Sequence, residues 1–274
     1  MLEILFGSPK EARTMYSIFR SISETFLSEL QLVNNQCIKI NPKSWDFALE
    51  QFVIPGLIKF IIGHKEHHLI MNMLKELYYF SEEEEQQQIL HIAQSILEGE
   101  RDEIPKVQQL TPREHFVREA LEEFLRPDLY FTYSSFQKFR LQKYLHSLRE
   151  YVEIAIEEYK MEQEYQNFIQ SLREYLCENK SEIQTIHIVC DREYVVYNDE
   201  KCMIPEDELK KLIDKDFVYQ HPMYIDSKLL APLVSMAPLK ISLYANDSFD
   251  GMIQTIQNIF EERVTIHRLE DFYV

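Results

Sequence analysis

Glycine is scarce in this chain, which has five glycines among 274 residues. No Gly-rich loop that could hold a phosphate group can be built from them, and this excludes the commonest nucleotide-binding motifs. Cysteine is scarce as well, and the four cysteines include no C-x-x-C pair. In a chain of this size without a secretion signal we expect them to be reduced thiols.

Positive charge is in deficit. Lys and Arg number 29 against 46 Asp and Glu, which gives a formal net charge of −17. Such a surface repels phosphate backbones and anionic lipids, so we expect neither nucleic acid nor a membrane surface as a partner. The most apolar stretch, Phe52 to Ile62, is about half the ~20 residues that a membrane span needs. We therefore expect a soluble, cytoplasmic protein.

The first 43 residues predict a strand–helix–strand arrangement. A strand is expected over residues 1–6, and a second one over Cys37 to Ile40. Between them, Ser8 is a helix N-cap, Pro9 suits the first helical position, and Glu11 completes a capping box. The apolar spacing that follows predicts a helix from Pro9 to about Leu32.

Residues 44–180 predict a helical domain, with a break or kink at Pro55-Gly56. Its longest helix is expected to reach about Asn179. The apolar stripe of this helix changes register near Met161, where Tyr165 and Phe168 begin a shifted stripe. An intramolecular bundle explains the shift, and a homodimer through the long helix is the alternative. Tyr165 and Phe168 are the candidate residues for self-association or partner binding.

Residues 181–274 predict a small α/β domain, because strand-like and helix-like periods alternate along them. A hairpin is expected around Asp191-Arg192, with strands over residues 183–189 and 194–197. Beyond it we expect helices over 205–213, 226–236 and 247–262 and strands over 240–245 and 263–267. The predicted fold class is therefore α+β and mostly α-helical. A central helical bundle accompanies the small α/β unit, and the N-terminal strand–helix–strand is a candidate to join the C-terminal sheet.

The densest cluster of metal-binding residue types is His64, His67 and His68. On a helix, His64 and His68 occupy adjacent turns and could bind a divalent transition metal, with Glu66 as a further ligand. The zincin motif requires Glu directly after the first His, where this chain has Lys65. The alternative is an amphipathic helix with histidines beside its apolar face.

Cys190, followed by Asp191 at the end of a predicted strand, is the cysteine best placed for a nucleophile. His187 lies three residues earlier, and positions i and i+3 of a strand point to opposite faces, so a buried structural thiol is the alternative. Aromatic residues are dense at 78–80 and 130–133. Their neighbours are acidic, which favours core packing or a protein–protein surface over base stacking.

Three stretches together resemble the YtxC-like family of sporulation-associated proteins from endospore-forming Firmicutes. The likeness covers nearly the whole chain. It is carried by Phe60–Glu66 with Tyr79-Phe80 and Ile96–Gly99, by Leu230–Ile241 (LAPLVSMAPLKI), and by Thr255–Val264 (TIQNIFEERV). The resemblance implies a cytoplasmic protein used in sporulation, and it implies no catalytic residue.

The resemblance and the lack of a catalytic motif favour a non-enzymatic interaction or regulatory protein of sporulation. No cofactor is expected. The alternative is a metal-dependent enzyme or metal-binding protein that uses His64, His67 and His68. A third possibility is a binder of small molecules in a cleft, for which the sequence offers no residue signature.

Overall fold

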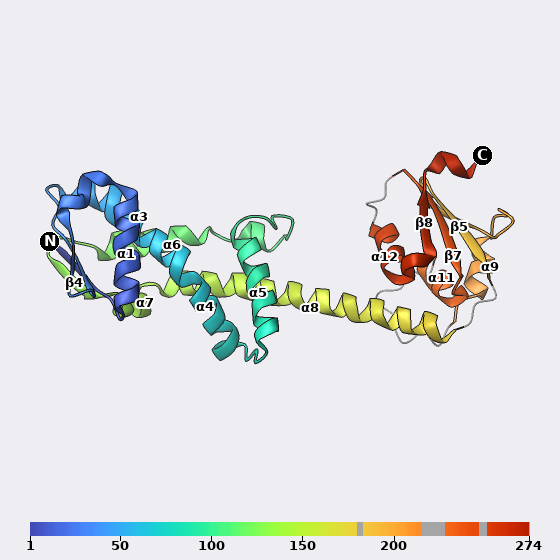
Figure 1. Ribbon diagram of the computed structural model, residues 1–274, viewed down its shortest axis with the longest axis horizontal. Coiled ribbons are helices and arrows are strands. Elements are labelled where there is room, and N and C mark those ends of the chain that lie inside the picture. Colours follow the sequence, from blue (N-terminus) through green and yellow to red (C-terminus); the bar gives the residue numbers. More distant parts are fainter. Residues whose placement is uncertain (180–182, 215–227, 247–250, 274) are drawn as a thin grey trace. The chain divides into compact units, whose positions relative to one another are not determined.

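The computed structural model describes residues 1–179, 183–214, 228–246 and 251–273. The chain divides into two compact units, unit 1 (Met1–Lys160) and unit 2 (Met161–Val274) (Figure 1). The boundary falls inside helix α8 (Gln142–Glu178), which contributes its first part to unit 1 and its last part to unit 2. The sequence predicted boundaries after residues 43 and 180 instead. The N-terminal strands and the helices share one hydrophobic core, and this unites them in unit 1.

Unit 1 contains a four-stranded sheet of order β2-β3-β1-β4. Strand β1 pairs antiparallel with β3 and parallel with β4, and Leu2 lies opposite both Ile40 and Leu129. The N-terminal strands therefore complete their sheet with β4 and not with the C-terminal sheet that the sequence suggested. The strands of this sheet are β1 (Leu2–Leu5), β2 (Leu30–Val33), β3 (Cys37–Ile40) and β4 (Leu129–Thr132).

Helix α1 (Pro9–Ile22) begins as predicted: the Ser8 Oγ accepts the backbone N–H of Glu11 at 3.2 Å, and Pro9 is the first helical residue. The helix ends ten residues earlier than predicted, because Leu30 to Val33 pair with β3 as a strand. A 3-10 helix, η1 (Glu24–Glu29), makes the connection. The remaining helices of unit 1 outside the long segment described next are α5 (Glu83–Leu97), η5 (Val107–Gln109), α6 (Arg113–Phe124) and α7 (Tyr133–Arg140).

A helical segment from Trp45 to Leu77 alternates α-helical and π-helical turns. Of the break or kink predicted at Pro55-Gly56, a break is not present: a π turn lies just before Pro55, where the N–H of Ile54 donates to the carbonyl of Leu49. The wider turn makes room for the proline ring and keeps the helix continuous. Its parts are α2 (Trp45–Ala48), η2 (Leu49–Val53), α3 (Ile54–Phe60), η3 (Ile61–Lys65), α4 (Glu66–Asn72) and η4 (Met73–Leu77).

This segment is the one helix in the described part of the chain that is long and apolar enough to cross a membrane, by length and composition. Half of its most apolar window is buried inside the structure, and core helices of soluble proteins pass the same test. Its burial has a specific basis at Gly56, where a β-carbon would lie 2.4 Å from Cε1 of Phe19. The glycine thus lets α3 pack closely on α1.

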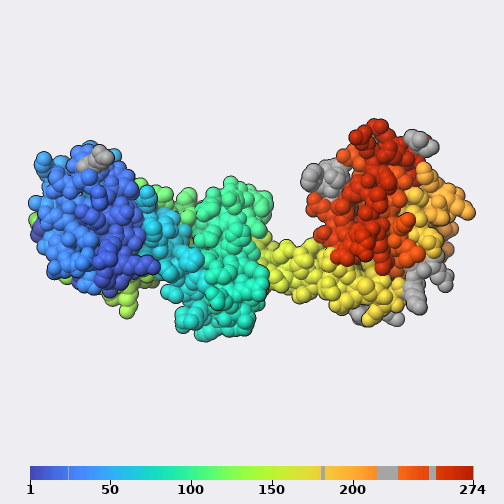
Figure 2. All heavy atoms as spheres, viewed as in Figure 1, coloured from blue at the N-terminus to red at the C-terminus, as the bar shows by residue number. Residues whose placement is uncertain are grey.

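Unit 2 is built on a second four-stranded sheet, of order β6-β5-β7-β8. Strands β5, β7 and β8 run parallel, and β6 forms the predicted hairpin with β5. One face of the sheet packs on helices, including the last part of α8, which lies against the rest of unit 2 in Figure 2. The strands are β5 (Thr185–Cys190), β6 (Tyr194–Tyr197), β7 (Lys240–Ala245) and β8 (Val264–His267).

The helices of unit 2 confirm the mixed α/β character, so the α+β, mostly helical fold class is correct. Residues 226–227 and 247–250 of two predicted helices lie outside the described residues. Besides α8, the described helices are α9 (Glu206–Lys211), α11 (Leu230–Met236), α12 (Gly251–Phe260), η6 (Glu261–Arg263) and η7 (Leu269–Phe272).

Candidate functional site

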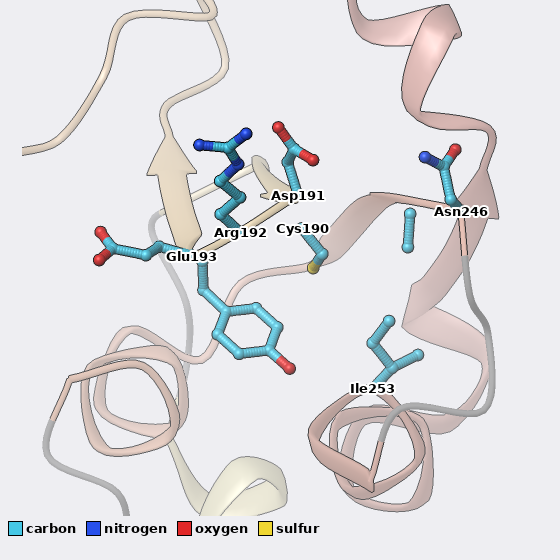
Figure 3. Close-up of a pocket in the computed structure, with 8 residues that line it drawn as sticks. Cys190, Asp191, Arg192, Glu193, Asn246 and Ile253 are labelled. Atoms are coloured by element: carbon cyan, nitrogen blue, oxygen red, sulfur yellow. The ribbon is translucent and has the colours of Figure 1, made fainter.

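The candidate site of unit 2 lies at the carboxyl ends of the neighbouring parallel strands β5 and β7. Open α/β sheets commonly bind ligands at such an edge. Cys190 ends β5, and Asn246 follows β7 directly. With the hairpin after β5 and the start of α12 they enclose a pocket of about 270 Å³ (Figure 3). Its walls are Cys190, Asp191, Arg192, Glu193, Tyr194, Ala245, Asn246 and Ile253.

Figure 3 shows how these side chains lie. Asp191 and Arg192 extend from the hairpin, Asn246 stands on the opposite side, and Cys190 lies between them. Ile253 of α12 supplies an apolar wall. Carboxylate, guanidinium and amide groups offer hydrogen bonds of both kinds, so this pocket can bind a small polar ligand.

The arrangement around Cys190 does not support nucleophilic catalysis with His187. Cys190 packs against the helix-covered face of the sheet, whereas His187 Nδ1 lies 3.2 Å from the Tyr244 hydroxyl on the other face, near Phe272. Burial lowers the pKa of His187, and the positive charge of Lys201 lowers it further. An activated thiol needs its base within hydrogen-bond reach, and the sheet separates these two residues.

The predicted metal ligands are all exposed on unit 1. His64 and His68 line a common pocket together with Lys65, and the ring of His67 packs edge-on against His68 at 5.6 Å. Within the described residues, no group of three or more His, Cys, Asp or Glu side chains could hold a metal ion. The geometry therefore gives the metal hypothesis no support.

Glu66, between these histidines in sequence, is buried instead. Its Oε2 accepts hydrogen bonds from Arg113 Nε at 2.8 Å and from the Tyr144 hydroxyl at 2.9 Å. Arg113 also donates to the carbonyl of Leu97 at the end of α5. Burial raises the pKa of Glu66, and Arg113 and Tyr144 oppose the rise. This cluster joins α4, α5, α6 and α8. The sequence contained one indication of this cluster: Glu66 lies four residues before Ile70, so both lie on the same, buried face of the helix.

Tyr165 and Phe168, the predicted interaction residues, have packing partners inside unit 2. Phe168 is 5% exposed and belongs to the hydrophobic core. Tyr165 packs beside that core, and its hydroxyl accepts a hydrogen bond from Asn258 Nδ2 at 3.2 Å. A contact with a partner through these two residues stays a prediction.

The dense aromatic patches divide into buried and exposed residues. Phe131 and Tyr133 are buried in the core of unit 1, whereas Tyr130 is 60% exposed. Tyr79 is 83% exposed, and Phe139 of α7 is 68% exposed. Core packing therefore holds for Phe131 and Tyr133, whereas Tyr79 and Tyr130 are exposed. A protein–protein surface at the exposed residues stays a prediction.

Comparison with known proteins places the chain in a family. The model of the YtxC-like family matches residues 51–265. A protein of Bacillus subtilis (strain 168), named "Uncharacterized protein YtxC", is 43% identical over 272 residues, which cover 99% of this chain and 96% of that protein. No solved structure matches the chain. The resemblance seen in the sequence is thus confirmed, and the chain belongs to the YtxC-like family.

Proposed function

We propose that this protein is a non-enzymatic interaction protein of the cytoplasm, used in sporulation, and that Tyr79 contacts its partner. The observation that carries the proposal is the backbone of Tyr79, which has a φ of 59° while its side chain is 83% exposed. The left-handed backbone costs stability, and the exposed ring recovers none of that cost by packing, so the ring is best explained by a function outside the fold.

Tyr79 follows the end of the helical segment at Leu77. The N–H of Tyr78 donates to the carbonyl of Met73, and the N–H of Phe80 donates to that of Leu74. The residue between these two donors has a left-handed conformation, for which glycine is the usual choice. A residue with a β-carbon costs about 1–2 kcal/mol there.

The neighbours of Tyr79 do stabilise the fold. The hydroxyl of Tyr78 donates to Glu153 at 2.8 Å, and the ring of Phe80 packs edge-on against Tyr159. Exposed aromatic rings are enriched where proteins meet partners, because a large rigid surface is buried at a small entropic cost. Tyr130 and Phe139 are further exposed aromatic residues of the same unit.

The separation of Cys190 from His187 by the sheet favours an interaction role over catalysis. The cytoplasmic, sporulation-related context rests on the family resemblance, since its members come from endospore-forming bacteria. A homodimer is one form that such an interaction could take.

Complementation tests the proposal. In an endospore-forming host that carries a close homologue, deletion of the gene should lower the count of heat-resistant spores, and the wild-type chain should restore it. Tyr79→Gly should fail to restore it although the protein folds and accumulates. Tyr78→Phe, which removes only the hydroxyl of the preceding residue, should restore the count of heat-resistant spores.

A second variant separates interaction from catalysis. Cys190→Ser with Asp191→Asn should complement fully if unit 2 performs no covalent chemistry. Normal spore counts with Tyr79→Gly would overturn the contact assigned to Tyr79. Loss of complementation by the folded Cys190 and Asp191 variant would overturn the non-enzymatic role. Normal sporulation in the deletion strain would remove the sporulation context.

A further inference from the structure

A second pocket lies in unit 1 beside the carboxyl end of β1. Strands β1 and β4 are parallel; helix α1 begins at Pro9, shortly after β1 ends at Leu5, and α7 begins directly after β4. The pocket of about 320 Å³ lies between the first turns of α1 and the segment around η3 and α4. Its walls are Ser8, Lys10, Glu11, Thr14, Phe60, His64, Lys65 and His68.

The charge of this pocket differs from that of the whole chain. Two lysines and two histidines face one acid, Glu11, in a protein with 46 acidic and 29 basic residues. The first turn of α1, a helix of 14 residues, adds the positive end of the helix dipole and the backbone N–H of Lys10. Pro9 has no N–H, and the N–H groups of Glu11 and Ala12 donate to Ser8. Basic side chains next to a helix N-terminus are suited to bind the oxygens of an anion.

An independent observation comes from Tyr133, which is not part of the pocket wall but contacts residues that are. Tyr133 is 2% exposed, and its hydroxyl has no hydrogen-bond partner among the residues that the structure describes. Three residues of the pocket wall surround it: Phe60 packs edge-on at 5.2 Å, the Lys65 ammonium lies 5.8 Å above the ring, and Glu11 interacts with the hydroxyl electrostatically.

Buried hydroxyl groups ordinarily have a partner. Burial and the negative charge of Glu11 both raise the pKa of the Tyr133 hydroxyl, so it keeps its proton and remains a donor. A bound acceptor would give this group the partner that the described residues of the protein do not supply.

The Lys65 ammonium pairs with the Glu11 carboxylate at 2.5 Å. A phosphate group carries more charge and more acceptor oxygens than this single carboxylate, and it would compete with Glu11 for Lys65. Lys10 is exposed at the start of α1 and is available from the other wall.

We propose that this pocket binds a small phosphorylated ligand, whose phosphate is held by Lys10, Lys65, His64, His68 and the first turn of α1, with the Tyr133 hydroxyl as a further donor. The histidine pair seen in the sequence thus serves an anion. The site is independent of Tyr79 and of the proposed interaction role.

Calorimetric titration of the full-length chain with inorganic phosphate tests the site, at an ionic strength held constant with KCl. We expect saturable binding by the wild type. Lys65→Gln and Lys10→Gln should each weaken it roughly tenfold, as expected for the loss of one hydrogen bond to a charged group. Lys59→Gln is the matched control, because Lys59 is exposed on the same helical segment and does not line the pocket.

Two more variants separate binding from folding. Glu11→Gln should strengthen phosphate binding, because it removes the competing carboxylate. Tyr133→Phe should weaken binding without lowering the melting temperature, because it deletes a hydroxyl that has no partner. Absence of saturable binding by the wild type would overturn the proposal. The proposal would also be overturned if Lys65→Gln and Lys10→Gln bound phosphate as tightly as the wild type. Parallel titrations with sulfate and citrate show whether phosphate is preferred, and tighter citrate binding would reassign the site to carboxylates.

Discussion

Arg113 and Glu66 form an ion pair inside unit 1, with 2.8 Å between Nε and Oε2 and side chains that are 18% and 9% exposed. Removing one member of a buried pair leaves the other charge without compensation. The arginine also donates a hydrogen bond to the carbonyl of Leu97, and so connects the end of α5 to α6. This pair is therefore expected to be a major determinant of the stability of the helical part of unit 1.

Arg113→Met should lower the free energy of unfolding of unit 1 by about 3–5 kcal/mol. Urea titration followed by circular dichroism measures the change. Arg118→Met is the control, since Arg118 forms exposed pairs with Glu114 and Glu122 on the same helix and should change stability by about 0–1 kcal/mol. Equal effects of the two substitutions would contradict the role of the buried pair.

The pH dependence of stability should report Glu66. Burial raises the pKa of this carboxyl in the folded state above its ordinary value. A group that binds its proton more tightly when folded contributes stability that is lost as pH rises through the folded-state pKa. Relative to Glu66→Gln, the wild type should therefore become less stable from about pH 4.3 upward. Parallel unfolding curves at each pH for the two proteins measure the difference, and a constant difference would refute the prediction.

Gly56 and Gly63 offer a matched pair of substitutions in one helical segment. Gly56→Ala places a β-carbon 2.4 Å from Phe19 and should destabilise unit 1 by about 1–3 kcal/mol. The β-carbon of Gly63→Ala meets no atom of the described residues within 4 Å, and this substitution should stabilise unit 1 by about 0.5–1 kcal/mol. Thermal melts of the wild type and of both variants measure these changes in stability. If Gly56→Ala stabilised the protein instead, the close packing of α3 on α1 would not contribute to the stability of unit 1.

His187 should make unit 2 sensitive to acid. Its pKa is lowered in the folded state by burial and by Lys201. The unfolded chain then binds the proton more readily, so unit 2 loses stability as pH falls below about 6.5, the ordinary value for histidine. Thermal melts between neutral and mildly acidic pH should show this loss, and His187→Gln should reduce it. His91→Gln, an exposed control, should leave it unchanged.

Phe168→Ala should destabilise unit 2 by about 3–5 kcal/mol, the cost of a large cavity in a core. Phe139→Ala removes an exposed ring and should change stability by less than about 0.5 kcal/mol. Urea titration compares the two, and native mass spectrometry reports the oligomeric state. If Phe168→Ala unfolded like the wild type and yet dissociated a dimer, the ring would serve a partner and not the core.

Local signals in the sequence were sufficient for several elements. The cap at Ser8, the hairpin at Asp191 and the strand from Lys240 to Ala245 depend on turn chemistry and on a two-residue period. Strand β4 could not be predicted in this way. It has four residues, its alternation is masked by neighbouring aromatic residues, and its strand conformation depends on pairing with β1.

The sites were predicted less well, because they depend on residues that are distant in the sequence. The histidines suggested a metal from their own spacing, but their surroundings include Lys10 and Glu11 on another helix. The left-handed backbone of Tyr79 had no sequence signal, since tyrosine is rarely found in that conformation. The opposite orientation of Cys190 and His187 was predictable, as it follows from the alternation of a strand.

The pairing of β1 with β4 has a consequence for synthesis on the ribosome. Leu2 leaves the ribosome long before its parallel partner Leu129, with roughly 6–25 s between them at about 5–20 residues per second. During that interval β1 can pair with β3 but presents its other edge unpaired. Such an edge can recruit strands from other chains. We therefore expect the yield of correctly folded protein to be sensitive to the speed of translation, or to a chaperone that shields this edge, until β4 emerges and completes the sheet.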